Sequence, residues 1–421
     1  MEKALPEAIS PPPRGQVDFD VIRGDFPIFA NSREPLHYLD SAASSHKPGC
    51  VIDSISNCYS RYYGPVHRGL YPLAESASEH YEASRQTIAH FINAQSSDQV
   101  VFTRSATEAI NLVASGWAGR HLQRGDEIWV SQMEHHSNFL PWQRICRHRG
   151  ARLRIIPLDS GGQLDLENAE GIFGTKSRLI AITQVSNVLG VINPIEQIVE
   201  RAKQHAIPVL VDAAQSVGHM PVDVQKLDCD FLVASAHKMC GPTGIGFLYG
   251  NPQRLAETEP LLLGGGMVDE VKVDSSSWAE IPARFEAGSP DLSGAVGFAA
   301  AVEYLLGIGM QAIEQRLREL TVHAYQTLLD IDGTTLYGPE NAGNRSGIIS
   351  FNIDDIHPHD VAHIAAEQGV AIRAGHHCCQ PLMQQLGVSS TARASFNIYN
   401  NEQDIAALGR AIEEAKRVLR G

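Results

Sequence analysis

The chain of 421 residues is 43% hydrophobic, which is long and apolar enough for a large core and more than one domain. Its formal net charge of −14 makes nucleic acid and anionic membranes poor partners, and its odd number of cysteines, seven, does not suit the disulfide framework of a secreted protein. The N-terminus lacks the apolar core of a signal peptide, and no uninterrupted apolar run reaches membrane-spanning length. We therefore expect a soluble, cytoplasmic protein that binds neither nucleic acid nor membrane.

The N-terminal residues differ in pattern from the centre of the chain. Residues 1–19 are rich in proline and are expected to form a flexible tail. From about residue 98, short apolar runs alternate with segments of helical spacing, such as 106–119 and 194–206. The predicted strands are the apolar runs at 99–103, 126–132, 178–185, 207–212, 230–235 and 245–250. Continuous apolar strands between helices predict an α/β fold with a mostly parallel sheet that is covered on both faces.

The pattern changes near residue 293 and predicts a second, smaller α+β domain. The elements predicted there are helices at 293–307, 310–330, 358–369 and 401–420 and strands at 346–353 and 370–374. We expect the large domain over residues 41–305 and the small C-terminal domain over residues 306–421. Residues 20–40 are expected to pack against the small domain.

The run RAGHHCCQPLM, residues 373–383, places two histidines next to two cysteines. A zinc site is disfavoured, because zinc ligands usually come in pairs separated by two to four residues and no second Cys/His pair has that spacing. A disulfide between adjacent cysteines would need a strained ring. The remaining interpretations are a reactive thiol and a buried free cysteine that packs as a small hydrophobe.

Polar residues follow several predicted strands, at the sheet edge where open parallel sheets bind ligands. Asp212 ends the strand 207–212, and Lys238 follows the strand 230–235. A buried lysine has a lowered pKa and can form a Schiff base, and a buried carboxylate needs a positive partner. Pyridoxal phosphate requires both groups, a lysine for its aldehyde and an aspartate for its pyridinium nitrogen. An ordinary surface lysine is the alternative interpretation.

Two further segments suit the same cofactor. Ser105, Ala106 and Thr107 lie where a predicted strand turns into a helix, a place where free N–H groups and the helix dipole favour a phosphate. A simple helix cap is the alternative for this turn. His135, in the run MEHHSN, follows the strand 126–132, and its imidazole could lie flat on a cofactor ring. A structural histidine is the alternative there.

Seven motifs together resemble the Suf-type, group II cysteine desulfurases: MEHHSNFLPW, QVSNVLG, VLVDAAQSVG, ASAHKMCGPTGIG, RFEAGSPD, RAGHHCCQPLM and TARASFNIYN. These are class V aminotransferase-like enzymes that use pyridoxal 5'-phosphate, and the resemblance extends from about residue 25 to the C-terminus. It implies a fold-type I PLP-dependent transferase with a mostly parallel seven-stranded sheet. It also implies that sulfur is removed from L-cysteine, giving L-alanine and a persulfide on Cys378, to supply iron–sulfur cluster assembly.

The resemblance also implies roles for individual residues. Cys378 attacks sulfur, Lys238 carries the cofactor and acts as the base, and His135 stacks on the cofactor ring. The implied cofactor-binding residues are Ala106, Thr107, His135, Asp212, Gln215, Ser235, His237, Lys238 and Ser289, the last of which reaches in from the second subunit of a homodimer. The implied substrate-binding residues are Ala42, Ala43, His67, Arg68, Asn187, Arg373 and Arg393. No metal ligand is implied.

Cys379 departs from the family, which usually carries alanine, threonine or another small residue at this position. Because one backbone step rotates the side chain away, we expect Cys378 to face the cofactor and Cys379 to be a bystander. The expected partner is a sulfur-acceptor protein, SufE-like or SufU-like. The alternative functions are a selenocysteine lyase, another class V aminotransferase or lyase, and a catalytically silent assembly scaffold, which the intact Lys238, Asp212 and Cys378 disfavour.

Overall fold

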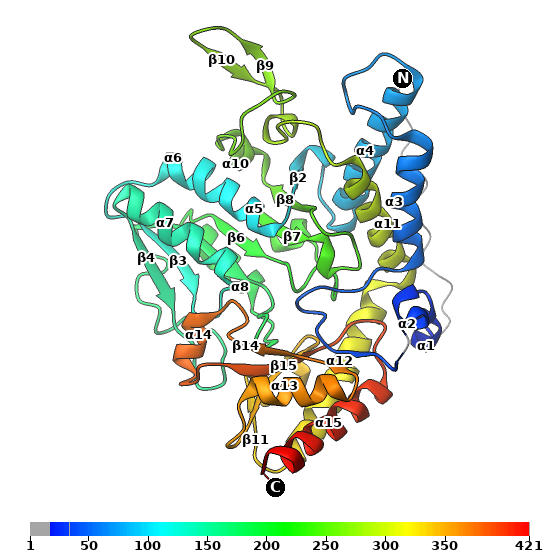
Figure 1. The fold of residues 1–421 in the computed structure, drawn as a ribbon. Coiled ribbons are helices and arrows are strands. Elements are labelled where there is room, and N and C mark those ends of the chain that lie inside the picture. Colours follow the sequence, from blue (N-terminus) through cyan, green and yellow to red (C-terminus); the bar gives the residue numbers. More distant parts are fainter. Residues whose placement is uncertain (1–16, 33, 421) are drawn as a thin grey trace.

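The computed structural model describes residues 17–32 and 34–420, and its centre is a seven-stranded sheet (Figure 1). The strands are β2 (Val100–Thr103), β3 (Glu127–Ser131), β4 (Arg152–Ile156), β5 (Ser177–Thr183), β6 (Val209–Asp212), β7 (Phe231–Ser235) and β8 (Gly246–Gly250). Their order is β2-β8-β7-β6-β5-β3-β4. Neighbours pair in parallel except β8, which is antiparallel to both β2 and β7. The predicted mostly parallel, seven-stranded sheet is confirmed.

Helices cover both faces of this sheet, which is why its central strands are apolar throughout. In β6, Val209 and Val211 belong to one hydrophobic cluster and Leu210 to the other, because successive side chains point to opposite faces. The helices of this part are α3 (Gly49–Asn57), α4 (Pro72–Phe91), α5 (Ala106–Leu112), α6 (Gly119–His121), α7 (Leu140–Arg149), α8 (Ile195–Gln204), α9 (Val224–Leu227), α10 (Pro252–Ala256) and α11 (Leu292–Ile308). Helices α4, α8 and α11 contribute to the first cluster, and α5 and α7 to the second.

A second sheet, antiparallel throughout, forms the C-terminal part, drawn yellow to red in Figure 1. Its strands, in the order β11-β12-β15-β14, are β11 (Thr334–Tyr337), β12 (Ile348–Ile353), β15 (Thr391–Ser395) and β14 (Arg373–Gly375). Its helices are α12 (Met310–Leu329), α13 (Pro358–Glu367), α14 (Gln380–Gln385) and α15 (Glu402–Arg420). The chain turns from α11 into α12 at Gly309, whose φ of 96° is a conformation that favours glycine. The predicted boundary at 305/306 lies inside α11.

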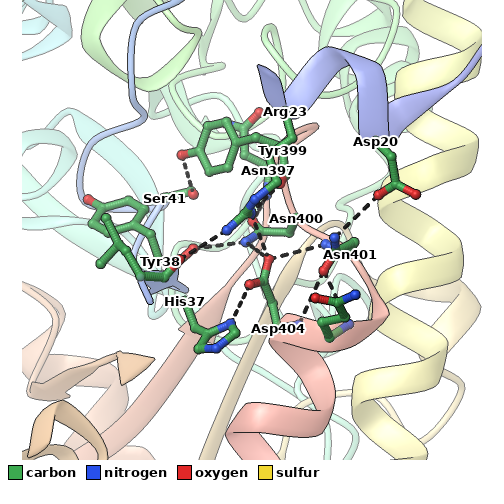
Figure 2. A network of polar contacts seen from close by, with 12 residues as sticks. Asp20, Arg23, His37, Tyr38, Ser41, Asn397, Tyr399, Asn400, Asn401 and Asp404 are labelled. Carbon is green, nitrogen blue, oxygen red and sulfur yellow. Dashed lines mark hydrogen bonds and ion pairs between the residues drawn. The ribbon is translucent and has the colours of Figure 1, made fainter. Parts of the chain in front are cut away.

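The N-terminal segment packs against this C-terminal part, as Figure 2 shows. It contains α1 (Phe19–Gly24), α2 (Pro27–Asn31) and β1 (His37–Tyr38), which pairs in parallel with β13 (Val370–Ala371). The buried Asp404 carboxylate lies 3.1 Å from Arg23 Nη1 and 2.7 Å from His37 Nδ1. Such contacts are of the kind expected for residues 20–40, while the domain boundaries themselves stay predictions.

The local structure differs from the sequence-based expectations in three places. Strand β4 was not predicted, because three of its five residues are exposed at the sheet edge and two of them are arginines. The run 370–374 was expected to form one strand, but β13 and β14 are separate and pair with different partners, β1 and β15. Residues 1–16 of the predicted tail lie outside the described residues, whereas Asp18 already caps α1.

Two further features complete the description. Strands β9 (Val268–Val271) and β10 (Ser276–Trp278) form a hairpin that projects away from the C-terminal part in Figure 1. Among the described residues, no single helix is long and apolar enough to cross a membrane. The pair α11 and α12 meets the length and composition criteria together, with a 78° bend between the two helices.

Candidate active site

A cavity of about 170 Å³ lies where the carboxyl ends of the large-sheet strands meet the C-terminal part. Its walls bring together residues that are up to about 350 positions apart in the chain. The predicted site residues that line it are Ala42, Ala43, Ala106, Thr107, His135, Asn187, Asp212, Gln215, Ser235, His237, Lys238, Arg373, Cys378 and Arg393. Binding at the carboxyl edge of a parallel sheet is the arrangement expected for an open α/β fold.

Asp212 and Lys238 form the charged floor of the cavity. Asp212 is the last residue of β6, and Lys238 ends the short 3-10 turn η5 (Ala236–Lys238) that follows the neighbouring strand β7. Burial lowers the pKa of Lys238 to about 8, although the Asp212 charge acts in the opposite direction. Burial raises the pKa of Asp212, opposed by the hydrogen bond from the Ala214 N–H and by Lys238. The lysine amine can therefore lose its proton near neutral pH, as a Schiff-base lysine must.

The turn between β2 and α5 forms a polar pocket at one end of the cavity. Ser105 caps α5, and the Ala106 N–H donates to Ser235 Oγ at 2.8 Å. The hydroxyl of Thr107 lies 2.7 Å from that of Ser137. Gly246 lets β8 pass this turn, since a Cβ there would lie 2.9 Å from Ser105 Cα. Clustered hydroxyls at the start of a helix suit a phosphate.

His135 and Gln215 present neutral polar groups to the cavity. Burial, and next the nearby Lys238 charge, lower the pKa of His135 to about 3, so the ring is uncharged at neutral pH. Its Nδ1 accepts the Ser137 N–H at 3.1 Å. Gln215 Nε2 donates to the Ala42 carbonyl at 2.8 Å, while its buried Oε1 has no partner in the part of the chain that is described. A buried acceptor without a partner is typical of a ligand site.

The two cysteines of the loop between β14 and α14 point in different directions. Cys378 is half-buried and lines the cavity. Cys379 is fully buried in an apolar cluster with Met133 and Leu382, and its thiol donates to the Glu134 carbonyl at 3.2 Å. Burial raises the pKa of the Cys379 thiol well above its usual range. Of the two, only Cys378 is therefore placed to react with a molecule in the cavity.

The loop has an unusual backbone. His377 and Cys378 both have positive φ, 50° and 56°, a conformation that costs non-glycine residues free energy. Hydrogen bonds hold the loop there: Asn187 Nδ2 donates to the His377 carbonyl at 2.8 Å, and His377 Nε2 lies 3.0 Å from Thr391 Oγ1. Two consecutive strained residues at a cavity wall are typical of a functional loop.

Arg393, in β15 of the C-terminal part, provides a buried guanidinium at the cavity wall. Its Nη1 donates to the Asn187 carbonyl at 2.8 Å, and its Nη2 lies 2.9 Å from Asp40 Oδ1. Burial lowers its pKa, and the Asp40 charge acts against that shift. Its Nε is buried and has no hydrogen-bond partner among the described residues. This arrangement leaves the guanidinium able to bind a carboxylate.

Three predicted site residues do not line this cavity within one chain. Ser289 lines a second, open cavity beside Tyr81 and Glu286. Arg68 Nη2 donates to the Gly288 carbonyl at 3.1 Å, next to Ser289. His67 Nε2 lies 3.1 Å from Glu82 Oε1. Their roles in binding stay predictions.

The sequence-based assignments omitted several groups in or beside the cavity. Ser137 and Thr183 line it. Glu134 is fully buried beneath it: its carboxylate accepts the Thr183 N–H at 3.0 Å and the Asn138 amide at 2.6 Å. Burial raises the pKa of Glu134 to about 8. Ser137 could have been found from its place two residues after His135, whereas Glu134 and Thr183 carry no sequence signal, because only the pairing of their strands brings them together.

These residues fit pyridoxal phosphate. A buried carboxylate, a lysine of lowered pKa and an uncharged imidazole line the same cavity, and a hydroxyl-rich helix start suits the phosphate. The unpartnered Oε1 of Gln215 can accept a hydrogen bond from the ring hydroxyl. Lys238, Asp212, Gln215 and the Ala106–Thr107 turn could therefore hold the cofactor.

Comparison with known proteins places the chain in one family. The profile of the class V aminotransferases matches residues 37–408. A probable cysteine desulfurase of Halalkalibacterium halodurans is 47% identical over 382 residues, 91% of this chain and 93% of its own. The apo cysteine desulfurase of Thermococcus onnurineus NA1 superposes with a TM-score of 0.90 at 40% identity, over 94% of this chain and 98% of its own. The Escherichia coli cysteine desulfurase CsdA gives a TM-score of 0.89 at 36% identity, over 96% and 99%. The chain therefore belongs to the class V aminotransferase family, together with these cysteine desulfurases.

Proposed function

We propose that this protein is a cysteine desulfurase, which moves the sulfur of L-cysteine onto Cys378 and releases L-alanine. One observation carries the proposal: Cys378 and Lys238, from the two parts of the chain, line the same cavity beside Asp212. Transamination alone has no need of a thiol at this place. The names of the relatives support the same reaction.

Pyridoxal phosphate, when bound, takes up the amino group of cysteine and draws electrons from its α-carbon. The chain supplies the rest. Asp212 would pair with the ring nitrogen of the bound cofactor and favour its protonated form, and the neutral His135 ring would pack against the cofactor without adding charge. Arg393 and the nearby Asn187 bind the substrate carboxylate, which fixes the side-chain sulfur toward the thiol loop.

Lys238 moves the proton of the α-carbon. Its pKa of about 8 keeps part of the amine neutral at physiological pH, so Nζ can accept a proton. Full burial of this amine without Asp212 beside it would remove the charge altogether. Asp212 and the burial of Lys238 together therefore set the basicity of the Lys238 amine, the same amine that would bind the cofactor.

Cys378 accepts the sulfur. Its thiolate attacks the substrate sulfur, a new S–S bond forms, and the bond between the substrate sulfur and Cβ breaks. The electron pair of that bond stays with the carbon fragment, which takes up protons and leaves as alanine. The balance is cysteine plus the enzyme thiol giving alanine plus the enzyme persulfide, with no external oxidant or reductant.

We also propose that two copies form the working enzyme. Ser289, Arg68 and His67 lie away from the cavity of their own chain. Large apolar side chains are exposed on the neighbouring helices, including Tyr59, which is 60% exposed, and Leu73, which is 43% exposed. A second subunit that covers this surface would bring Ser289 to the phosphate of the partner site.

The persulfide has to leave the enzyme, and we propose a SufE-like or SufU-like acceptor protein working with it in the cytoplasm. His376 and Gln380, on either side of the thiol loop, are exposed, so the loop lies at the surface. All seven cysteines are free, which suits a reducing compartment. The acceptor would supply sulfur to iron–sulfur cluster assembly.

A product assay tests the function. The purified enzyme with pyridoxal phosphate should convert L-cysteine into equal amounts of alanine and, with a thiol reductant, sulfide. Without reductant it should give one alanine per site and keep the sulfur on the protein. Formation of pyruvate or of a keto acid in place of alanine would refute the proposal, and turnover of selenocysteine alone would point to a selenocysteine lyase.

A further inference from the structure

Two imidazoles, the half-buried His136 and the exposed His376, lie against the backbone of the thiol loop, outside the cavity. The Cys378 N–H donates to His376 Nδ1 at 3.1 Å, and the Gln380 N–H donates to His136 Nε2 at 3.3 Å. The backbone N–H of His136 also donates to the Cys378 carbonyl at 2.7 Å. The two rings lie 5.6 Å apart. Both backbone polar groups of Cys378, its N–H and its carbonyl, are thus hydrogen-bonded.

Both rings act here as hydrogen-bond acceptors. An imidazole nitrogen can accept only while it carries no proton, so each ring must be neutral, with its proton on the other nitrogen. The bonds matter more than usual at this place, because Cys378 and its neighbour His377 have the left-handed backbone conformation. Without external hydrogen bonds, such a segment relaxes toward ordinary dihedral angles and turns the thiol away from the cavity.

We propose that His136 and His376 are positioning residues that hold Cys378 in its sulfur-accepting place only while both imidazoles are neutral. The inference rests on the proposed function and extends it, because it makes the delivery of the thiol, and not cofactor chemistry, sensitive to acid. Neither ring lines the cavity, so neither contacts substrate or cofactor.

The surroundings of His136 favour its neutral form. The pKa of His136 is lowered, first by partial burial and then by His376. Burial first, and then nearby charged and titratable groups, also lower the pKa of the neighbouring imidazoles His135 and His377. Those groups are Lys238 in η5, Arg373 in β14, Arg393 in β15 and the two rings His136 and His376 themselves.

Acid should therefore release the loop. When a ring takes up a proton, its accepting nitrogen becomes a donor that faces the N–H of Cys378 or Gln380, so an attraction becomes a repulsion. Two protonated rings at 5.6 Å would also repel one another. The ordered thiol is expected at neutral and alkaline pH and is lost as the pH falls.

Paired substitutions test this role. His376→Asn keeps an oxygen at the place of Nδ1, and His136→Gln keeps one near the place of Nε2, whereas His376→Ala and His136→Ala remove the acceptors. We expect each alanine variant to lower kcat for alanine formation about tenfold, the factor for one lost hydrogen bond in the reacting state, with KM for cysteine nearly unchanged. The Asn and Gln variants should stay within about threefold of the native enzyme. His148→Ala, at an exposed histidine of α7, is the matched control.

A pH series separates positioning from simple stability. The ratio of native kcat to that of the His136→Gln/His376→Asn double variant should fall severalfold between about pH 8 and about pH 5.5, since only the native loop can be protonated there. Any decrease of kcat at low pH that the native enzyme and the double variant share cancels in this ratio.

A second readout needs no turnover. Alkylation of Cys378 by a neutral reagent, followed by peptide mass spectrometry, should speed up in the alanine variants and not in the Asn and Gln variants at one pH. Native-like kinetics and alkylation in the alanine variants, or a constant ratio across pH, would overturn the inference. That outcome is distinct from failure of the proposed function, in which the native enzyme itself forms no alanine from cysteine.

Discussion

The two walls of the cavity are built in different ways. The large-domain wall consists of strand ends: Asp212 ends β6 and Lys238 directly follows β7, and both strands are fully buried in a paired sheet. The opposite wall carries Cys378 on a short loop with positive φ, which hydrogen bonds with Asn187, His136 and His376 hold in place. The hydrogen-bonded pairing of the strands fixes the positions of Asp212 and Lys238. The position of Cys378 depends instead on a few polar contacts of its loop.

This difference suits the two tasks of the proposed enzyme. Groups that bind and polarise the substrate work best at fixed places. The thiol must first meet the substrate in the cavity and then present its sulfur to an acceptor outside, so a loop serves better than a strand end. Substitutions on the sheet wall should therefore abolish chemistry outright, and those on the loop wall should divide into one essential residue and several graded ones.

Lys238→Ala should have the largest effect. Loss of the base and of the covalent anchor should lower alanine formation by about 10³-fold or more. The fold should survive, because the lysine lies at the rim of the sheet and not within the hydrophobic clusters. Turnover is measured as alanine per site and folding by circular dichroism. Lys226→Ala, at an exposed lysine, is the control, and native activity of Lys238→Ala would remove this residue from the mechanism.

Cys378→Ala should stop sulfur release from cysteine while the yellow colour of the bound cofactor stays. The thiol acts after the substrate has bound, so cofactor absorbance and its change on adding cysteine should be native. Selenocysteine should still be processed, since its carbon–selenium bond is weaker. The exposed Cys50 provides the control, Cys50→Ala. Full activity on cysteine without Cys378 would show that another residue accepts the sulfur.

Arg393→Lys sharpens the comparison, because Arg393 lies in a strand of the C-terminal part and yet touches Asp40 and Asn187. A lysine cannot make the paired contacts of a guanidinium, so KM for cysteine should rise by about tenfold or more. The change in kcat should be smaller than the change in KM. Steady-state kinetics measures both, and an unchanged KM would place the substrate carboxylate elsewhere.

Cys379→Ala should have the smallest effect. Its side chain lies in the apolar cluster and not in the cavity, so kcat should stay within about threefold of native. Removal of one buried sulfur should cost about 1 kcal/mol of unfolding free energy, measured by urea denaturation. After a single turnover without reductant, the persulfide should be found on Cys378. Its appearance on Cys379 would reverse the assignment of the two cysteines.

Much of the sheet wall was predictable from sequence. Buried parallel strands leave continuous apolar runs, and a charged residue at the end of such a run, as at Asp212, marks the ligand edge. Edge strand β4 escaped prediction because its exposed arginines remove that signal. The contacts of the loop that carries Cys378 were less predictable from sequence. The His136 N–H donates to the Cys378 carbonyl from about 240 positions away, and Asn187 donates to the His377 carbonyl from about 190 positions away. No local sequence pattern predicts such contacts.

The domain-linking contacts of the N-terminal segment could be anticipated only in outline. That residues 20–40 face the C-terminal part followed from the family resemblance, but the buried Asp404 that binds both Arg23 and His37 did not. An aspartate in the first turn of a helix is expected in any helix, because the positive end of the dipole favours it. The contacts of the same carboxylate with Arg23 and His37 are visible only in the structure (Figure 2).

The contacts of Asp404 with Arg23 and His37 also limit when the chain can finish folding during synthesis. Arg23 and Asp404 are 381 positions apart, so the first helix leaves the ribosome long before its partner in α15 exists. The large sheet can form during synthesis, but β1 has no partner until β13 is made, and Ser41 has none until Tyr399 is made. Ala42 and Ala43, which follow directly, line the cavity. This part of the cavity wall is thus completed late in synthesis. A chain that ends before α15 contains Lys238 and Cys378 but lacks Asp404, which holds Arg23 and His37 of the N-terminal segment.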